Sequence, residues 1–148
     1  MKLLDNHLTF DVAVRVFDFG TREFNQLVET LRTALFEATA AAGHDSVSTL
    51  VFGHPSDLPY VERVEATATR CGVELARVQL CPPPAVLYER VTSGSRPTSN
   101  KIRDVDTLRE VLGHHDLYTR IDETDLTIDN TAMSPDEVVD TIATHLGL

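Results

Sequence analysis

The fold of this chain is decided by residues 47–80, which read VSTLVFGHPSDLPYVERVEATATRCGVELARVQL. The first six of these residues are β-rich and stop at Gly53, as expected of a strand. Residues 56–70 then show apolar side chains at helical spacing, and Gly72 ends that pattern. Residues 73–80 are a second β-rich run, closed by three prolines. The stretch therefore predicts a strand, a helix and another strand.

The same alternation continues on both sides of this stretch. Further helices are expected at residues 21–42, 84–91, about 104–112 and 134–146, with a further strand at 126–129. The last helix carries the clearest local signal, because Ser134 is its cap, Pro135 takes its first position and Glu137 completes a capping box. Strands that alternate with helices predict a parallel sheet covered on both faces, a three-layer α/β/α sandwich formed by one domain. Such sheets bind ligands at the carboxyl ends of their strands.

Composition narrows the classes of function. The chain has 148 residues, with 23 acidic against 13 basic side chains and a formal net charge of −10, which argues against binding nucleic acid by phosphate attraction. No apolar run reaches the roughly 20 residues of a membrane span, so we expect a cytoplasmic protein. Cys71 and Cys81 form no disulfide framework, and the adjacent His114 and His115 point in different directions, so no metal site is expected.

Several short motifs of the chain follow one another in an order that a known enzyme family shares. A strand, a proline turn and a helix ending at Arg90 precede a polar loop that contains Arg96. This arrangement is similar to the lid of small P-loop kinases, here at about residues 90–103. The segment from Asn130 to Pro135 is similar to the wall of the adenine pocket in shikimate-kinase-like members. Near the N-terminus, residues 6–11 and 17–27 resemble the substrate side of a less characterised branch that is often labelled ATPase or kinase. The resemblance implies a P-loop NTPase fold of the nucleotide and shikimate kinase type.

The phosphate-binding loop of that family is missing. It needs the pattern G-x-x-x-x-G-K-[ST], because backbone N–H groups cradle phosphate while Lys and Ser/Thr hold the phosphate oxygens and Mg²⁺. None of the seven glycines is followed by lysine. By the resemblance, the chain begins at the second strand of the family and is N-terminally truncated. Three explanations stay open: a misassigned start, a sheet that closes up or borrows a strand from a partner, or a decayed gene. An exposed sheet edge would favour a homodimer.

The resemblance implies ATP and Mg²⁺ as cofactors and phosphoryl transfer to a hydroxyl of a small molecule. In that interpretation His7 or Asp11 handles the acceptor hydroxyl and Asp5 lies on the substrate side. Arg90 and Arg96 would neutralise the charge of the phosphoryl oxygens. A simpler interpretation makes Asp5 or Asn6 the cap of a helix that begins near residue 8 and His7 a surface residue. It also leaves the two arginines solvated.

The remaining candidates belong to the adenine and substrate sides. Arg90, Asn130 and Pro135 would border adenine, while Arg22 and His54 would face the substrate. In the simpler interpretation, Pro135 is the first residue of a helix, and His54 is a turn histidine that bonds to the backbone. Shikimate itself is excluded as a substrate, because the two arginines that would hold its carboxylate are absent. Catalysis by the chain as it stands is not expected without the phosphate loop. The alternative is a non-catalytic binding or oligomerisation module.

Overall fold

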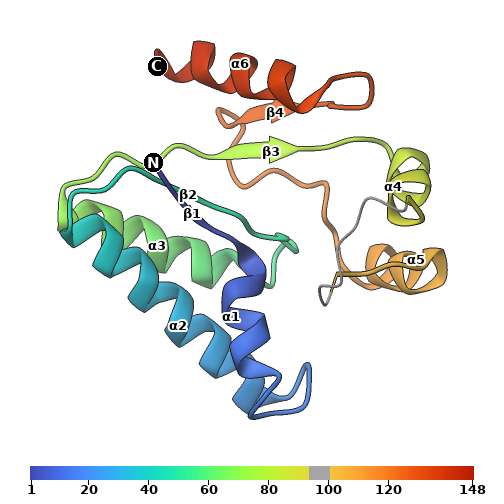
Figure 1. The fold of residues 1–148 in the computed structure, drawn as a ribbon, viewed down its shortest axis with the longest axis horizontal. Helices are drawn as coiled ribbons and strands as arrows, with labels where there is room; N and C mark the ends of the chain where they lie inside the picture. The colour runs from blue at the N-terminus through green and yellow to red at the C-terminus, as the bar shows by residue number, and fades with distance from the viewer. Residues whose placement is uncertain (94–100) are drawn as a thin grey trace. The chain divides into compact units, whose positions relative to one another are not determined.

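A computed structural model describes residues 1–93 and 101–148 (Figure 1). The chain is mixed α/β, with six helices and four short strands in the described residues. It divides into two compact units, residues 1–52 with 56–75 and residues 53–55 with 76–148.

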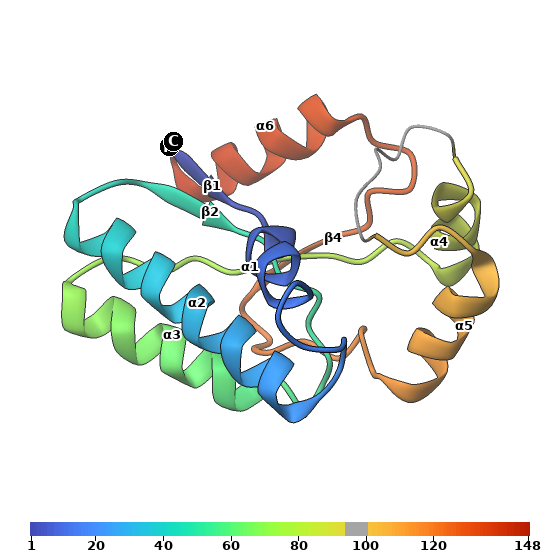
Figure 2. The same cartoon turned by 60° about the horizontal axis from the view of Figure 1, so that its bottom comes forward.

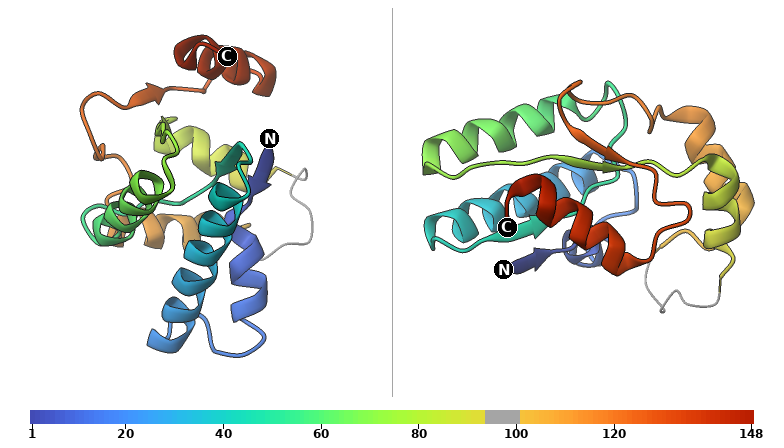
Figure 3. Two further views of the ribbon diagram at one scale, coloured as in Figure 1. Left: turned by 90° about the vertical axis from the view of Figure 1, so that its left-hand side faces the viewer. Right: turned by 90° about the horizontal axis from the view of Figure 1, so that it is seen from above.

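The first unit holds a two-stranded parallel sheet and three helices. Its elements are β1 (Lys2–Leu4), α1 (Asn6–Ala13), α2 (Arg22–Ala41), β2 (Ser46–Ser48) and α3 (Leu58–Cys71). Strand β1 pairs with β2 so that Lys2 lies opposite Ser46 and Leu4 opposite Ser48. Helix α2 packs against both α1 and α3, and Figure 3 shows α2 and α3 side by side.

Local signals explain where the helices of this unit begin and end. The Thr21 side chain caps α2 by accepting a hydrogen bond from the backbone N–H of Phe24, and Gly72 ends α3 in a left-handed conformation, with φ of 66°. Phe24 is the largest fully buried side chain among the described residues, and Ala13 and Val28 complete the small core around it. This core joins α1 to α2.

The second unit holds the other two-stranded parallel sheet. Its elements are β3 (Val78–Leu80), α4 (Pro84–Val91), α5 (Val105–His114), β4 (Leu126–Ile128) and α6 (Pro135–Leu146). Val78 lies opposite Leu126 in the β3–β4 pair. Helix α6 contacts β4, which precedes it along the chain (Figure 2).

Two polar interactions fix the ends of elements in the second unit. The predicted capping box of α6 is confirmed, because Glu137 N–H donates to Ser134 Oγ at 3.3 Å and Ser134 N–H donates to Glu137 Oε2 at 2.7 Å. Just before the strands, Arg77 Nε donates to both carboxylate oxygens of Asp125 at 3.0 Å. These contacts hold the chain that enters β3 to the chain that enters β4.

The alternation of helices with parallel strands is confirmed, but the strands are shorter than predicted. The β-rich residues 47–52 contribute only to β2 (Ser46–Ser48), and residues 73–80 only to β3 (Val78–Leu80). A strand is defined by its paired neighbour, and each of these strands pairs along three residues. The described strands lie in two separate two-stranded sheets. The single parallel sheet of a three-layer α/β/α sandwich therefore stays a prediction. No described helix is long and apolar enough to cross a membrane.

Candidate functional site

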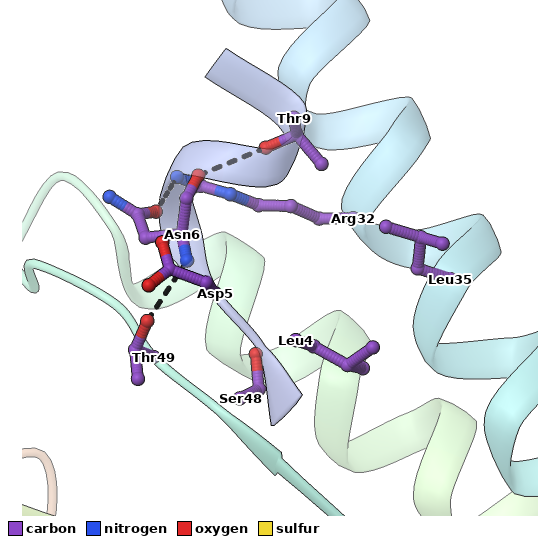
Figure 4. Close-up of a pocket in the computed structure, with 8 residues that line it drawn as sticks. All are labelled: Leu4, Asp5, Asn6, Thr9, Arg32, Leu35, Ser48 and Thr49. Atoms are coloured by element: carbon purple, nitrogen blue, oxygen red, sulfur yellow. Dashed lines mark hydrogen bonds between the residues drawn. The ribbon is translucent and has the colours of Figure 1, made fainter. Parts of the chain in front are cut away.

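A pocket lies in the first unit where the parallel strands β1 and β2 end. Its lining combines apolar side chains with a carboxylate, an amide, three hydroxyls and a guanidinium (Figure 4). The lining residues are Leu4, Asp5, Asn6, Thr9, Arg32, Leu35, Ser48 and Thr49. The cavity volume is about 10 Å³, enough for about one water molecule. The pocket thus lies at the carboxyl edge of a parallel sheet, which is where such sheets bind ligands.

The Arg32 guanidinium enters this pocket from the middle of α2. Its Nη2 donates to the side-chain oxygen of Asn6, and its Cζ lies 5.2 Å from the ring centre of Phe10 and 5.8 Å from that of Tyr60. Burial lowers the pKa of Arg32, an effect that Tyr60 and Asp57 oppose. The two rings therefore hold a cation that has lost part of its water.

The polar atoms of Arg32 are not all satisfied. Its Nε is buried without a hydrogen-bond partner. Asp57 attracts this guanidinium electrostatically and so favours its charged form. The Nε that lacks a partner still leaves Arg32 with an unused hydrogen-bond donor, for which an anion would be the best acceptor.

Hydrogen bonds attach the start of α1 to the end of β2. Asn6 N–H donates to Thr49 Oγ1 at 2.9 Å (Figure 4). His7 N–H donates to Asp5 Oδ1 at 2.7 Å. Thr9 Oγ1 donates to the Asn6 carbonyl oxygen at 3.3 Å. These contacts fix the Asp5 carboxylate and the Thr49 hydroxyl at the pocket.

The structure brings together only some of the candidate residues of the first unit. Asp5 lines the pocket and caps α1, which begins at Asn6 and not near residue 8. His7 follows it, and its Nδ1 is buried without a hydrogen-bond partner. Asp11 and Arg22 are exposed and do not line the pocket. Their expected roles stay predictions.

Sequence reasoning missed Arg32. The available signal is its place on α2, four residues after the buried Val28 and three before Leu35 of the pocket. Residues at this spacing share one helix face. A charged side chain on the packed face of a helix needs a reason, and such a position marks a candidate site. Its contacts with Phe10 and Tyr60 depend on α1 and α3, so they could not be predicted from α2 alone.

In the second unit, Arg90 and Asn130 lie in contact. Arg90 Nη2 donates to the Asn130 carbonyl oxygen at 2.7 Å and to that of Thr131 at 3.3 Å, while Nη1 donates to Asn130 Oδ1 at 3.2 Å. The arginine therefore ties the end of α4 to the loop after β4. Pro135 is the first residue of α6. Arg96 lies outside the described residues.

His54 forms an isolated antiparallel β-bridge with Asp116. Its N–H donates to the Asp116 carbonyl oxygen at 2.7 Å. The Asp116 carboxylate accepts hydrogen bonds from the side chain of Thr119 and from the backbone N–H groups of Thr119 and Tyr118, which lower its pKa to about 2. These contacts favour the interpretation of His54 as a turn histidine.

The described residues do not fit ATP with Mg²⁺ at a phosphate-binding loop. No group of three or more His, Cys, Asp and Glu side chains among them is placed to hold a metal ion. In the sequence, no glycine is directly followed by a lysine. The glycine–lysine pair of a phosphate-binding loop, whose lysine reaches the outer phosphates, is therefore missing.

Comparisons with known proteins give one likeness of fold. No family model matches this sequence, and no curated protein matches it. Among solved structures, the tunicamycin resistance protein of Deinococcus radiodurans is similar to this chain, with a TM-score of 0.61 and 19% identity. The similarity covers 99% of this chain and 80% of that one. At this identity the likeness shows a common fold, and a common fold does not imply a common function.

These findings correct the family assignment made from the sequence. The identification with P-loop small-molecule kinases and related ATPases is wrong, because no family model matches and the similar structure is a tunicamycin resistance protein. The motifs that suggested it have local explanations. Ser134 and Pro135 start a helix, and Arg90 bonds to the loop after β4. Short segments with such structural roles occur in unrelated proteins.

Proposed function

We propose that this chain is a non-catalytic binding domain for a small hydroxylated molecule that carries one anionic group. The anionic group of the ligand would reach toward Arg32 in the small pocket at the carboxyl ends of β1 and β2, and the rest of the molecule would lie over its opening. The observation that carries the proposal is Arg32, a partly buried guanidinium with a buried Nε that has no hydrogen-bond partner.

The energetic argument concerns the anionic group of the ligand. An unsatisfied buried donor costs on the order of 1–3 kcal/mol. A carboxylate or phosphate recovers that cost when a small movement of the neighbouring side chains lets it accept from Nε, and planar anions match the fork of N–H groups on the guanidinium. The rings of Phe10 and Tyr60 hold the guanidinium, so less side-chain entropy is lost when a ligand binds.

The rest of the pocket favours hydroxyl groups. Asp5 offers carboxylate oxygens that accept, while Ser48 and Thr49 offer hydroxyls that both donate and accept. The negative charge of Asp5 disfavours a second anion beside it. The ligand should therefore carry its anionic group at Arg32 and its hydroxyls toward Asp5.

Two other ideas supply probes for the same pocket. The name of the similar structure makes tunicamycin a ligand to test. Phosphoryl transfer from ATP stays a prediction from the sequence, and a titration with ATP and Mg²⁺ tests it.

The experiment is calorimetric titration of the full chain with ribose 5-phosphate, gluconate, tunicamycin and ATP·Mg²⁺. We expect saturable binding of at least one hydroxylated anion, weakened at least about tenfold, or 1.4 kcal/mol, in Arg32→Gln. Arg32→Lys should restore part of the affinity, since lysine keeps the charge but loses the planar fork. The matched control is Arg63→Gln, which removes a half-exposed arginine paired with Glu29 on the same unit.

Absence of binding to all four compounds by the folded chain would overturn the proposal. Binding that Arg32→Gln and Arg63→Gln weaken equally would also overturn it, because the effect would then be one of net charge. Phosphorylated product with ATP·Mg²⁺ would replace the non-catalytic proposal by an enzymatic one.

A further inference from the structure

A neutral amide accepts a hydrogen bond from Arg32 in the pocket. Arg32 Nη2 donates to the side-chain oxygen of Asn6, whose own backbone N–H donates to Thr49 Oγ1 at 2.9 Å (Figure 4). Asn6 is half-buried and lines the pocket together with Arg32. Position 6 is therefore held beside the guanidinium by both its backbone and its side chain.

Local stability would favour a carboxylate at position 6. Asn6 is the first residue of α1, directly after the cap Asp5, and the described residues of this first turn include no acidic side chain. A negative charge in a first turn interacts favourably with the helix dipole, and asparagine and aspartate have similar helix propensities. A carboxylate oxygen also accepts from a guanidinium more strongly than an amide oxygen does. A carboxylate would thus suit both the helix and Arg32.

The amide leaves the charge of Arg32 available to a ligand. Asp57 acts on the guanidinium electrostatically, and burial removes part of its water. The amide of Asn6 contributes a dipole but no net charge, so an anionic group that approaches Arg32 still gains Coulomb energy. A carboxylate bonded directly to the guanidinium would offset that charge and would repel a second anion.

We propose that Asn6 determines the specificity of the pocket, because its neutral side chain admits anions that a carboxylate at the same position would exclude. The class of ligand that it admits is an oxyanion, either a carboxylate or a phosphate ester. This inference rests on the proposed function, since it concerns the anionic group that Arg32 attracts. An amide at a position where a carboxylate would stabilise the fold is a cost in stability that binding explains.

The test compares variants of the full chain by calorimetric titration with gluconate and with ribose 5-phosphate. We expect Asn6→Asp to weaken the binding of the tighter of these two anions at least about tenfold. Asn6→Ser stays neutral and should keep the affinity within about threefold of wild type. The matched control is Asn25→Asp, which adds the same charge to an exposed residue near the start of α2, outside the pocket lining, and should have little effect.

Urea unfolding without ligand tests the contact independently. The free energy of unfolding of Asn6→Asp should equal or exceed that of wild type. The same substitution should be less favourable when Arg32→Gln is also present, because the carboxylate then has no guanidinium to pair with. A merely structural role for Asn6 predicts a loss of stability together with the loss of binding, and that result would contradict the inference.

The binding results separate this inference from the proposed function. Anion binding that Arg32→Gln weakens but Asn6→Asp leaves intact would overturn the inference and keep the proposed function. An equal loss of binding in Asn6→Asp and Asn6→Ser would do the same, because the charge at position 6 would then not matter. Absence of anion binding by the folded wild-type chain would overturn both.

Discussion

Arg32 combines a cost in stability with a capacity to bind. Its guanidinium is partly desolvated, which lowers its pKa, and its Nε has no hydrogen-bond partner. Replacing an imperfectly satisfied buried charge by an apolar side chain is often neutral or stabilising. Residues of this kind are retained where function needs them at the expense of stability.

Arg32→Leu should therefore leave the stability of the first unit unchanged or raise it, while it abolishes ligand binding. The loss of the contacts with Phe10 and Tyr60 should be offset by removal of the desolvation cost. Urea unfolding checks the stability and calorimetry the binding. A loss of stability above about 2 kcal/mol would show that Arg32 is mainly structural.

The Asp116 carboxylate makes the stability of the second unit depend on pH. Hydrogen bonds from Thr119 and Tyr118 place its folded pKa at about 2, below its ordinary 3.8. A depressed folded pKa stabilises the folded state above the unfolded pKa, and this stabilisation is lost as the pH falls through the folded pKa. The relevant window is thus from about pH 4 down to about pH 2.

Asp116→Ala should lower the stability of the second unit at neutral pH, and the difference from wild type should shrink as the pH falls from 4 toward 2. Urea unfolding at a series of pH values measures this difference. The control is Glu123→Ala, whose side chain is 96% exposed and whose removal should have little effect at any pH. A difference for Asp116→Ala that stays constant down to pH 2 would contradict the linkage.

At the scale of elements, α6 depends on its first turn. Ser134 and Glu137 satisfy each other's backbone N–H groups, and Asp136 adds a negative charge near the positive end of the helix dipole. Ser134→Ala should cost about 1 kcal/mol of stability, and Ser134→Asp should keep most of it. Hydrogen exchange of the amides in α6 measures the loss. Equal exchange rates in Ser134→Ala and Ser134→Asp would show that the cap does not limit the opening of the helix.

The helices were predictable because their signals are local, whereas the strands and the site were not. The start of α6 is encoded in four consecutive residues. The length of β2 depends on β1, some forty residues away, so the β-rich run 47–52 could not define its own paired part. From the sequence, a ligand site could be predicted only at the carboxyl edge of a sheet, with Asp5 at the end of the first strand. Arg32 was missed because three helices must meet before its surroundings exist.

At the scale of the molecule, negative charge opposes folding. A formal net charge of −10 on 148 residues produces repulsion that grows as the chain becomes compact. Surface ion pairs such as Arg70 with Glu37 offset little of it, because exposed pairs contribute about 0–1 kcal/mol. Salt screens repulsion between exposed charges beyond about 10 Å at roughly 0.1 M.

Added sodium chloride should therefore raise the melting temperature at pH 7, and most of the rise should occur at moderate ionic strength where screening develops. The control is the same titration near the sequence isoelectric point of about 4.9, where net repulsion is small and the rise should largely vanish. Sodium sulfate at matched ionic strength separates screening from the exclusion of salt from the protein surface, because sulfate adds a further increase by exclusion at both pH values. A melting temperature that falls with sodium chloride at pH 7 would mean that attractive ion pairs outweigh the net repulsion, in spite of the acidic balance of the chain.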